Sequence, residues 1–221
     1  MARQKIEMEP GGISPVQRDL WVAAVEKLDE ATAAVEQMGA AQDRIEFEAG
    51  WTRLVDSLEE FWARFFDEGK SRFPSFQPWA GAVLSFRKSE PLLQYLVQAR
   101  HQSQHGRIAL VWEEGRLQVA PGFSGAIRGF QAFEDGTFEI DAVPAHPSVP
   151  SPTLIHSPGR PHLPLIENKK HGGRFAPPTA YRGQLLQDAS PATVARIGID
   201  YYSGVVAGAL EKFGGQSASL A

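Results

Sequence analysis

The stretch that decides the fold is PLLQYLVQARHQSQHG, residues 91–106. Its apolar residues on one face are Leu92, Leu93, Leu96 and Val97. They recur with the spacing of an amphipathic helix, and Gly106 is a typical residue at which a helix ends. We therefore predict a helix that carries Arg100, His101 and His105 close to its C-terminal end.

The residues before this stretch predict further helices. Ser14, followed by a proline, is a good N-cap for a helix over 14–38. A second helix, from about 43 to 66, carries a broad stripe of aromatic and aliphatic residues and is expected to end by Gly69. A short third helix is predicted over 78–88. We expect the aromatic stripe to form the core between helices.

The residues after the stretch predict a different kind of structure. Two β-rich runs over 107–120 predict a hairpin, and a third strand is expected over 136–143. Prolines are dense over 144–164, which predicts an extended surface segment because proline disrupts helices and central strands. Ser190, again followed by a proline, predicts the start of a last helix.

Together these elements predict an α+β fold, mainly a helical bundle with a small antiparallel β insertion. The expected limits are 14–106 for the first part of the bundle and 107–189 for the β-hairpin and proline-rich insertion. The returning C-terminal helix of the bundle is expected over 190–213.

Composition excludes several classes of protein. The chain of 221 residues has no cysteine, which excludes disulfides, thiolate nucleophiles and cysteine-based metal sites. The formal net charge is −4, so nucleic-acid binding would depend on a local basic patch. We find neither a signal peptide nor an apolar stretch long enough to span a membrane. We therefore expect a cytoplasmic protein that binds no membrane.

Three interpretations apply to the basic cluster at the helix end. His101 and His105 are four residues apart, so they share a helix face on which a metal ion can bind if a third ligand is present. Basic side chains also stabilise a helix C-terminus through the helix dipole, by about 0.3–1 kcal/mol each. The third interpretation is a phosphate site formed by Arg100 and the histidines. We expect neither a cofactor nor a resident metal.

The segment ARHQSQHG, after the apolar PLLQYLVQ, resembles the signature of the HEPN superfamily. That signature is an arginine, a polar residue, three variable residues and a histidine. Arg100, His101 and His105 occupy the defined positions. The resemblance implies an all-helical bundle of about four helices that often dimerises. Many members of the superfamily are metal-independent endoribonucleases whose motif residues meet across the dimer interface, and others are non-catalytic interaction modules.

The chemistry of RNA cleavage suits these residue types. Histidine exchanges protons near neutral pH, so His105 is the candidate acid or base, with an effect on the order of 10²–10⁴ in rate. Arg100 is expected to hold the scissile phosphate, and His101 to orient it or share the proton transfer. On a regular helix Arg100 and His105 are roughly 140° apart around the axis, so a two-fold partner is expected to complete the site. This predicts a homodimer.

A second basic segment, NKKHGGR, lies in the predicted insertion. Lys169, Lys170 and Arg174 surround two glycines and form a candidate substrate-binding loop for RNA phosphates. The segment lacks the spacing of a P-loop. A solvated basic loop without a ligand is the alternative.

Overall fold

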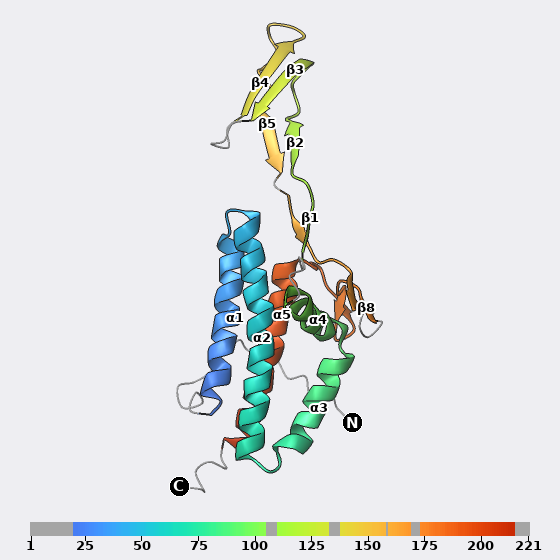
Figure 1. Ribbon diagram of the computed structural model, residues 1–221. Helices are drawn as coiled ribbons and strands as arrows, with labels where there is room; N and C mark the ends of the chain where they lie inside the picture. The colour runs from blue at the N-terminus through green and yellow to red at the C-terminus, as the bar shows by residue number, and fades with distance from the viewer. Residues whose placement is uncertain (1–19, 105–109, 133–137, 158, 169–172, 215–221) are drawn as a thin grey trace. The chain divides into compact units, whose positions relative to one another are not determined.

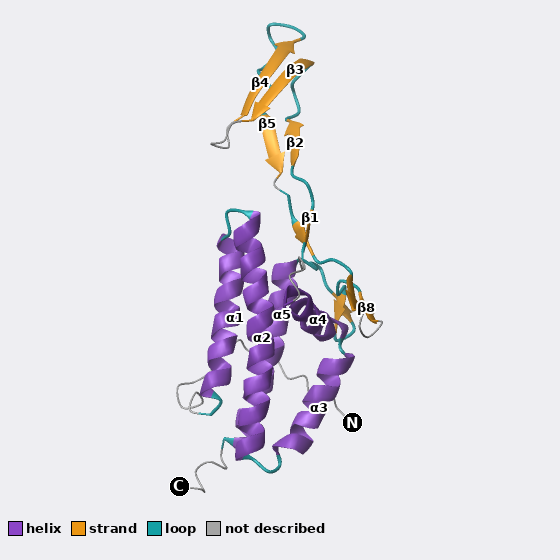
Figure 2. Ribbon diagram, in the orientation of Figure 1, coloured by secondary structure: helices purple, strands orange, loops and turns teal. Residues whose placement is uncertain are grey.

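The structure is a computed structural model that describes residues 20–104, 110–132, 138–157, 159–168 and 173–214. Within these residues the protein is α+β, with five helices and several short antiparallel strand pairs (Figures 1 and 2). The chain divides into two compact units, of which the first is Met1–Val111 with Leu163–Ala221 and the second is Trp112–His162.

The first unit contains all the helices that the structure describes. They are α1 (Val22–Ala40), α2 (Arg44–Arg72), α3 (Phe76–Ser89), α4 (Pro91–Gln104) and α5 (Pro191–Phe213). Helices α1 and α2 lie side by side, and α5 packs against α1, α2 and α4 although about 90 residues of sequence separate it from α4. Helix α5 therefore belongs to the same compact unit as α1 to α4.

Local capping explains where two of the helices begin. The Asp43 side chain accepts a hydrogen bond from the Glu46 backbone N–H at 2.8 Å, and α2 starts at the next residue. The Ser190 hydroxyl accepts from the Thr193 N–H at 3.3 Å ahead of α5. Both are N-caps that satisfy a donor of the first helical turn, and both starts agree with the sequence prediction.

Other helix limits differ from the prediction. Helix α1 begins at Val22, after Trp21 in a left-handed backbone conformation with φ of 61°. The cap predicted at Ser14 lies outside the described residues. Helix α2 continues past Gly69 to Arg72, so the prediction that Gly69 ends it is wrong. A Cβ atom on Gly69 would lie 2.3 Å from the Phe76 ring, so the glycine permits α3 to pack closely against α2.

An aromatic cluster joins the ends of four chain segments in the core. The ring centroids of Trp21 and Phe65 are 5.2 Å apart, those of Phe65 and Phe76 are 5.5 Å apart, and those of Phe76 and Phe213 are 5.8 Å apart. Each of these side chains is almost fully buried. The aromatic stripe predicted on the second helix therefore forms core, as expected.

A buried arginine links three helices at another point of the bundle. Arg87 of α3 is 8% exposed, and its Nε donates to the Tyr202 hydroxyl of α5 at 2.7 Å. Its guanidinium also forms an ion pair with Glu59 of α2 and lies 4.9 Å from the Trp62 ring centroid. A buried charge is tolerated here because it is paired and hydrogen-bonded.

Two small strand pairs belong to the helical unit. Strand β7 (Ile166–Asn168) pairs antiparallel with β8 (Gly173–Phe175), and β9 (Ala180–Tyr181) pairs with β10 (Gln184–Leu185). Residues of β7, β8 and β9 pack against α4. The predicted insertion, 107–189, thus includes the whole second unit and also residues of the first.

The second unit consists of two-stranded ladders. Its strands are β1 (Val111–Trp112), which begins at the last residue of the first unit, β2 (Arg116–Val119), β3 (Gly125–Ala132), β4 (Phe138–Pro144), β5 (Leu154–Ser157) and β6 (Pro161–His162). Strand β3 pairs with β4, β2 with β5, and β1 with β6. The predicted hairpin over 107–120 is wrong, because β1 and β2 pair with strands that return later in the chain and not with each other. The proline-rich segment supplies those later strands, and two-stranded ladders leave the open edges that proline requires.

Candidate functional site

Helix α4 carries the candidate site because its sequence divides into two faces. Leu92, Leu93, Tyr95, Leu96 and Ala99 are buried against the bundle. This burial leaves the polar residues at the C-terminal end of the helix at or near the surface. Arg100 is 25% exposed, and His101 is exposed.

Arg100 interacts with two side chains of its own chain, an ion-pair partner and a hydrogen-bond acceptor. Its Nε lies 3.5 Å from Asp56 Oδ1 of α2, which is an ion pair. The Gln104 amide, oriented with its oxygen toward Arg100, accepts from Nη2 at 2.6 Å and from Nε at 3.2 Å. The guanidinium is therefore held at the junction of α4 and α2, with an acidic group beside it.

Asp56 has an unusual environment for a carboxylate. Its side chain is 39% exposed, yet Oδ1 is buried and has no hydrogen bond among the residues that the structure describes. Burial raises the pKa of the Asp56 carboxyl, and the positive charge of Arg100 opposes that rise. The site thus contains a partly buried carboxylate that lies beside the positive charge of Arg100.

The structure describes one of the two motif histidines. His101 is described and lies in the last turn of α4. His105 lies outside the described residues, so its position relative to Arg100 stays a prediction. Within the described residues no three His, Asp or Glu side chains come together in a way that could hold a metal ion.

Two hydrogen bonds connect β7 and the residues just before it to helix α4, which bears the motif. The Asn168 side-chain Nδ2 donates to Gln98 Oε1 at 3.0 Å, and the Tyr95 hydroxyl donates to the Pro164 carbonyl at 2.8 Å. Asn168 is the residue directly before Lys169, and Gln98 is two residues before Arg100. The start of the basic segment is thereby placed beside the C-terminal half of α4.

The three predicted substrate-binding residues are only partly described. Lys169 and Lys170 lie outside the described residues. Arg174 is described, exposed, and paired with Glu167 across the hairpin, Nε to Oε1 at 3.3 Å. It also lines a pocket of about 300 Å³ formed with Pro91, Gln94 and residues 175–180. Gln94 and Arg100 are about 9 Å apart along the helix axis, so Arg174 borders the N-terminal half of α4.

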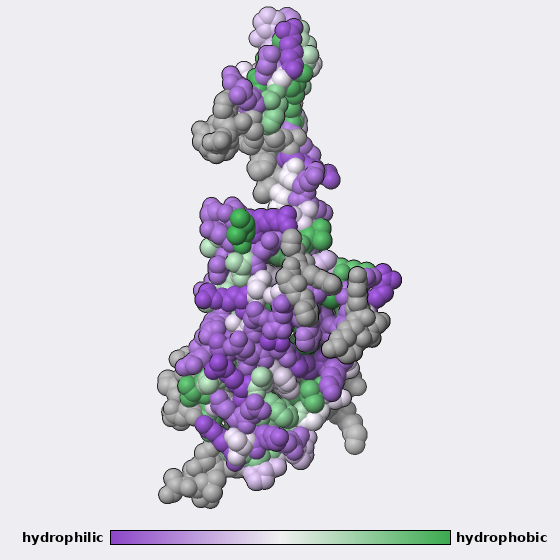
Figure 3. Space-filling view, viewed as in Figure 1, coloured by the Kyte–Doolittle hydropathy of each residue, from purple (hydrophilic) through white to green (hydrophobic). Residues whose placement is uncertain are grey.

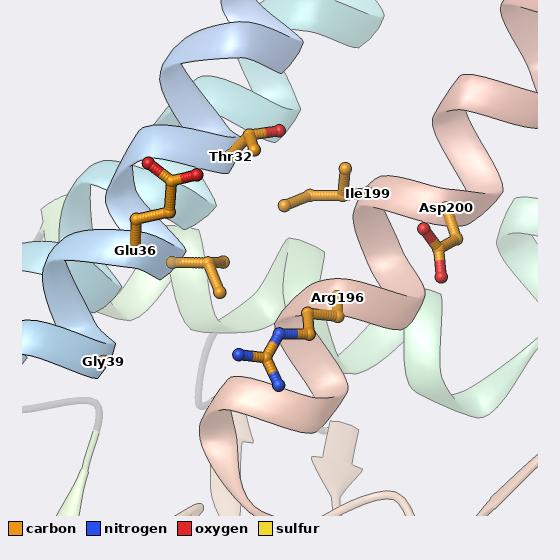
Figure 4. A pocket seen from close by; sticks show the side chains of 7 residues that line it. Thr32, Glu36, Gly39, Arg196, Ile199 and Asp200 are labelled. Atoms are coloured by element: carbon orange, nitrogen blue, oxygen red, sulfur yellow. The ribbon is translucent and has the colours of Figure 1, made fainter. Parts of the chain in front are cut away.

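Another pocket, of about 400 Å³, opens between α1 and α5 (Figure 4). Val35 and Ile199 give it an apolar wall, and Glu36, Arg196 and Asp200 bring charges to it. Figure 4 shows the Arg196 guanidinium extending toward the side of α1 that bears Glu36. None of the residues predicted from the sequence lies in this pocket.

Sequence reasoning did not find Asp56, Gln98 or Asn168. Asp56 is one of several acidic residues on an exposed helix face, and Gln98 and Asn168 are common surface residues. Their relation to Arg100 arises only when α2 and the β7–β8 hairpin pack against α4.

Comparison with known proteins identifies no relative. Models of known families, characterised proteins and solved structures were each compared with the chain, and none matches it. Among the helices that the structure describes, none is both long enough and apolar enough to cross a membrane.

Proposed function

We propose that this protein is a HEPN-like, metal-independent endoribonuclease that acts on cytoplasmic RNA as a homodimer. The observation that supports this function most is the hydrogen bond between Asn168 and Gln98. It connects Asn168, the residue before Lys169 in the sequence, to the helix of Arg100 and His101. Binding and cleavage of a phosphodiester require cationic donors and a histidine that transfers protons, and these are the residue types that the motif and the basic segment supply.

In the proposed reaction, Arg100 binds the scissile phosphate with its fork of N–H donors. The phosphate replaces the Asp56 carboxylate as ion-pair partner and the Gln104 carbonyl as acceptor, and it carries the same sign of charge as Asp56. A histidine of the motif removes the proton of the ribose 2′-hydroxyl, and the 2′-oxygen attacks the adjacent phosphorus. The bond from phosphorus to the 5′-oxygen breaks as that oxygen receives a proton from a second, protonated histidine of the motif. The products are a 2′,3′-cyclic phosphate and a 5′-hydroxyl.

The proposed dimer follows from the geometry of one helix. Arg100 and His105 would be roughly 140° apart around a regular helix, too far for both to contact one phosphate from the same helix. A second copy related by a two-fold axis supplies the missing group. Of the two motif residues that the structure describes, His101 is exposed in the last turn of α4 and Arg100 is partly buried beside Asp56.

The test is an RNA cleavage assay in EDTA with single substitutions. We expect cleavage by the wild type that is lost in both Arg100→Ala and His105→Ala. His146→Ala, which removes an exposed histidine of the second unit, is the matched control and should keep full activity. An RNA with a single 2′-deoxy nucleotide at the cleavage position should be resistant. Cleavage that neither motif substitution reduces would exclude this site.

A specific observation favours a second function, that of a non-catalytic dimeric interaction module. Arg100 is already paired with Asp56 and Gln104, so it can serve to join α4 to α2. In that case no RNA is cleaved, and Arg100→Ala lowers the stability of the fold without changing any product. Measuring RNA cleavage and thermal unfolding on the same samples separates the two functions.

A further inference from the structure

The pocket between α1 and α5 brings opposite charges to one small cavity. Its volume is about 400 Å³, and small-molecule sites typically measure about 300–1,000 Å³. Helix α1 contributes Glu36, and α5 contributes Arg196 and Asp200, all of which are exposed residues. Figure 4 shows Ile199 extending from α5 toward α1, with Glu36 on the facing helix. The pocket therefore offers a bound molecule one cationic group and two anionic groups.

These three charged groups do not pair with one another. Arg196 and Asp200 are four residues apart on α5, a spacing at which opposite charges commonly interact. Within the part of the chain that the structure describes, however, no ion pair or side-chain hydrogen bond joins Arg196, Asp200 or Glu36 to another residue. None of the three groups therefore has to leave a protein partner before it contacts a ligand.

The remaining lining has an apolar wall and one open position. Val35 is buried and Ile199 is partly exposed, so both can pack against the aliphatic part of a ligand. Gly39, in the last turn of α1, also lines the pocket. A Cβ atom at Gly39 would meet no other atom within 4 Å. The packing of the protein therefore does not require glycine at this position, and the missing side chain leaves the pocket open.

We propose that this pocket binds a free α-amino acid with a cationic side chain, such as lysine or ornithine. The carboxylate of the ligand accepts hydrogen bonds from the Arg196 guanidinium, whose fork of N–H donors matches a carboxylate. The α-ammonium and the side-chain ammonium pair with the carboxylates of Glu36 and Asp200. The single positive net charge of a basic amino acid balances the single negative net charge of these three residues.

The spacing of the charges on α5 suits a ligand of this length. Four residues rise about 6 Å along a helix axis, so the ligand groups that contact Arg196 and Asp200 are separated by about that distance. The methylene chain of lysine spans this separation and covers Val35 and Ile199 along its length. A neutral amino acid would leave one carboxylate of the pocket without a partner, and a diamine would leave Arg196 without one.

Charge and surface polarity argue against other kinds of ligand. Two carboxylates beside one guanidinium repel phosphate groups, which disfavours a nucleotide or a nucleic acid. On the face that Figure 3 shows, hydrophilic side chains cover most of the helical unit and hydrophobic ones are scattered among them. Scattered hydrophobic side chains are not the broad apolar patch that marks a protein interface. The inference does not depend on RNA cleavage, because no motif residue lines the pocket.

The test is the binding of L-lysine to the full chain, measured by isothermal titration calorimetry. We expect a Kd of about 1 mM or lower. Norleucine, which lacks the side-chain ammonium, and cadaverine, which lacks the carboxylate, should each bind at least tenfold more weakly than lysine. Equal binding of the three compounds, or no binding of lysine at concentrations up to about 10 mM, would overturn the proposal.

Substitutions locate the binding within this pocket. Arg196→Gln and Glu36→Gln should each weaken lysine binding at least tenfold, whereas Glu211→Gln, at an exposed carboxylate elsewhere on α5, should not. Gly39→Leu adds a side chain to the lining without a clash at its Cβ atom and should abolish binding. Gly81→Leu, at an equally open position of α3, is the matched control and should bind as the wild type does. Circular dichroism checks that each variant is folded. Lysine binding that survives both Arg196→Gln and Gly39→Leu would place the ligand elsewhere and overturn the proposal.

Discussion

Replacing Arg100 with alanine tests the proposed RNA cleavage separately from the stability of the fold. The ion pair with Asp56 joins a side chain that is 25% exposed to one that is 39% exposed. Ion pairs that are exposed to solvent to this extent stabilise proteins by about 0.2–1 kcal/mol. Loss of Arg100 also leaves the buried Asp56 Oδ1 without its nearby cation, which adds to the cost.

The expected loss of stability is therefore about 1 kcal/mol, and at most about 2 kcal/mol. For a chain of this length that corresponds to a fall of roughly 2–8 °C in Tm, at about 2–4 °C per kcal/mol. The protein stays folded at 25 °C because typical domains have a stability of about 5–15 kcal/mol.

The expected loss of activity is much larger. Removing a preorganised donor to the charge that develops in a transition state costs about 10²–10³ in kcat. We expect RNA cleavage by Arg100→Ala to fall by at least a hundredfold at a temperature where the variant is fully folded. The assays are thermal unfolding by circular dichroism and cleavage of end-labelled RNA in EDTA.

A matched control is available in another exposed ion pair. Arg44 of α2 pairs with Glu48, Nε to Oε1 at 2.7 Å. Arg44→Ala should cost about 0.3–0.5 kcal/mol, as is usual for such helix pairs, and leave cleavage unchanged. If Arg100→Ala loses 3 kcal/mol or more of stability while cleavage is retained, then the reasoning about Arg100 is wrong.

Three other predictions concern stability. Gly69→Ala should destabilise the fold by about 1–3 kcal/mol, because its Cβ would meet the Phe76 ring. Gly81→Ala, where the added Cβ meets open space, should stabilise the fold by up to about 1 kcal/mol. Urea unfolding of both variants measures the difference, and equal midpoints would contradict the prediction. Asp56→Asn should be more stable than the wild type at pH 7 but not below pH 3.8. Burial raises the pKa of the Asp56 carboxyl in the fold. The contribution of Asp56 to the free energy of unfolding is therefore favourable in acid and is lost as pH rises through the folded pKa. Thermal unfolding of both proteins across that pH range tests the sign, and a constant difference would refute it. Arg87→Met should lower the free energy of unfolding by about 3 kcal/mol, since it leaves the buried partners of that guanidinium unpaired. A decrease of less than about 1 kcal/mol, measured by urea unfolding, would show that those contacts contribute little.

The elements with local signals could be predicted from the sequence. Asp43 and Ser190 start helices because their side chains bond to N–H groups three residues away. The apolar face of α4 follows from a spacing of three and four residues. In each case the interacting groups lie within one helical turn of each other.

The strand pairing of the second unit could not be predicted in this way. The two runs over 107–120 are adjacent in sequence, which favoured a hairpin. In the structure Val119 pairs with Leu154, 35 residues later. Such pairing depends on contacts between residues far apart in the sequence, which no local sequence pattern predicts.

The sequence by itself determined most of the helices, their buried faces and the position of Arg100 and His101 near a helix end, since these depend on short-range periodicity and capping. Only the tertiary structure decided what surrounds Arg100. Asp56 lies 44 residues before it, and the hairpin of Asn168 lies about 70 residues after it. Asp56 and Asn168 lie near α4 because α2 and β7 pack against it. This packing depends on the complete surfaces of these elements and not on any short segment of sequence.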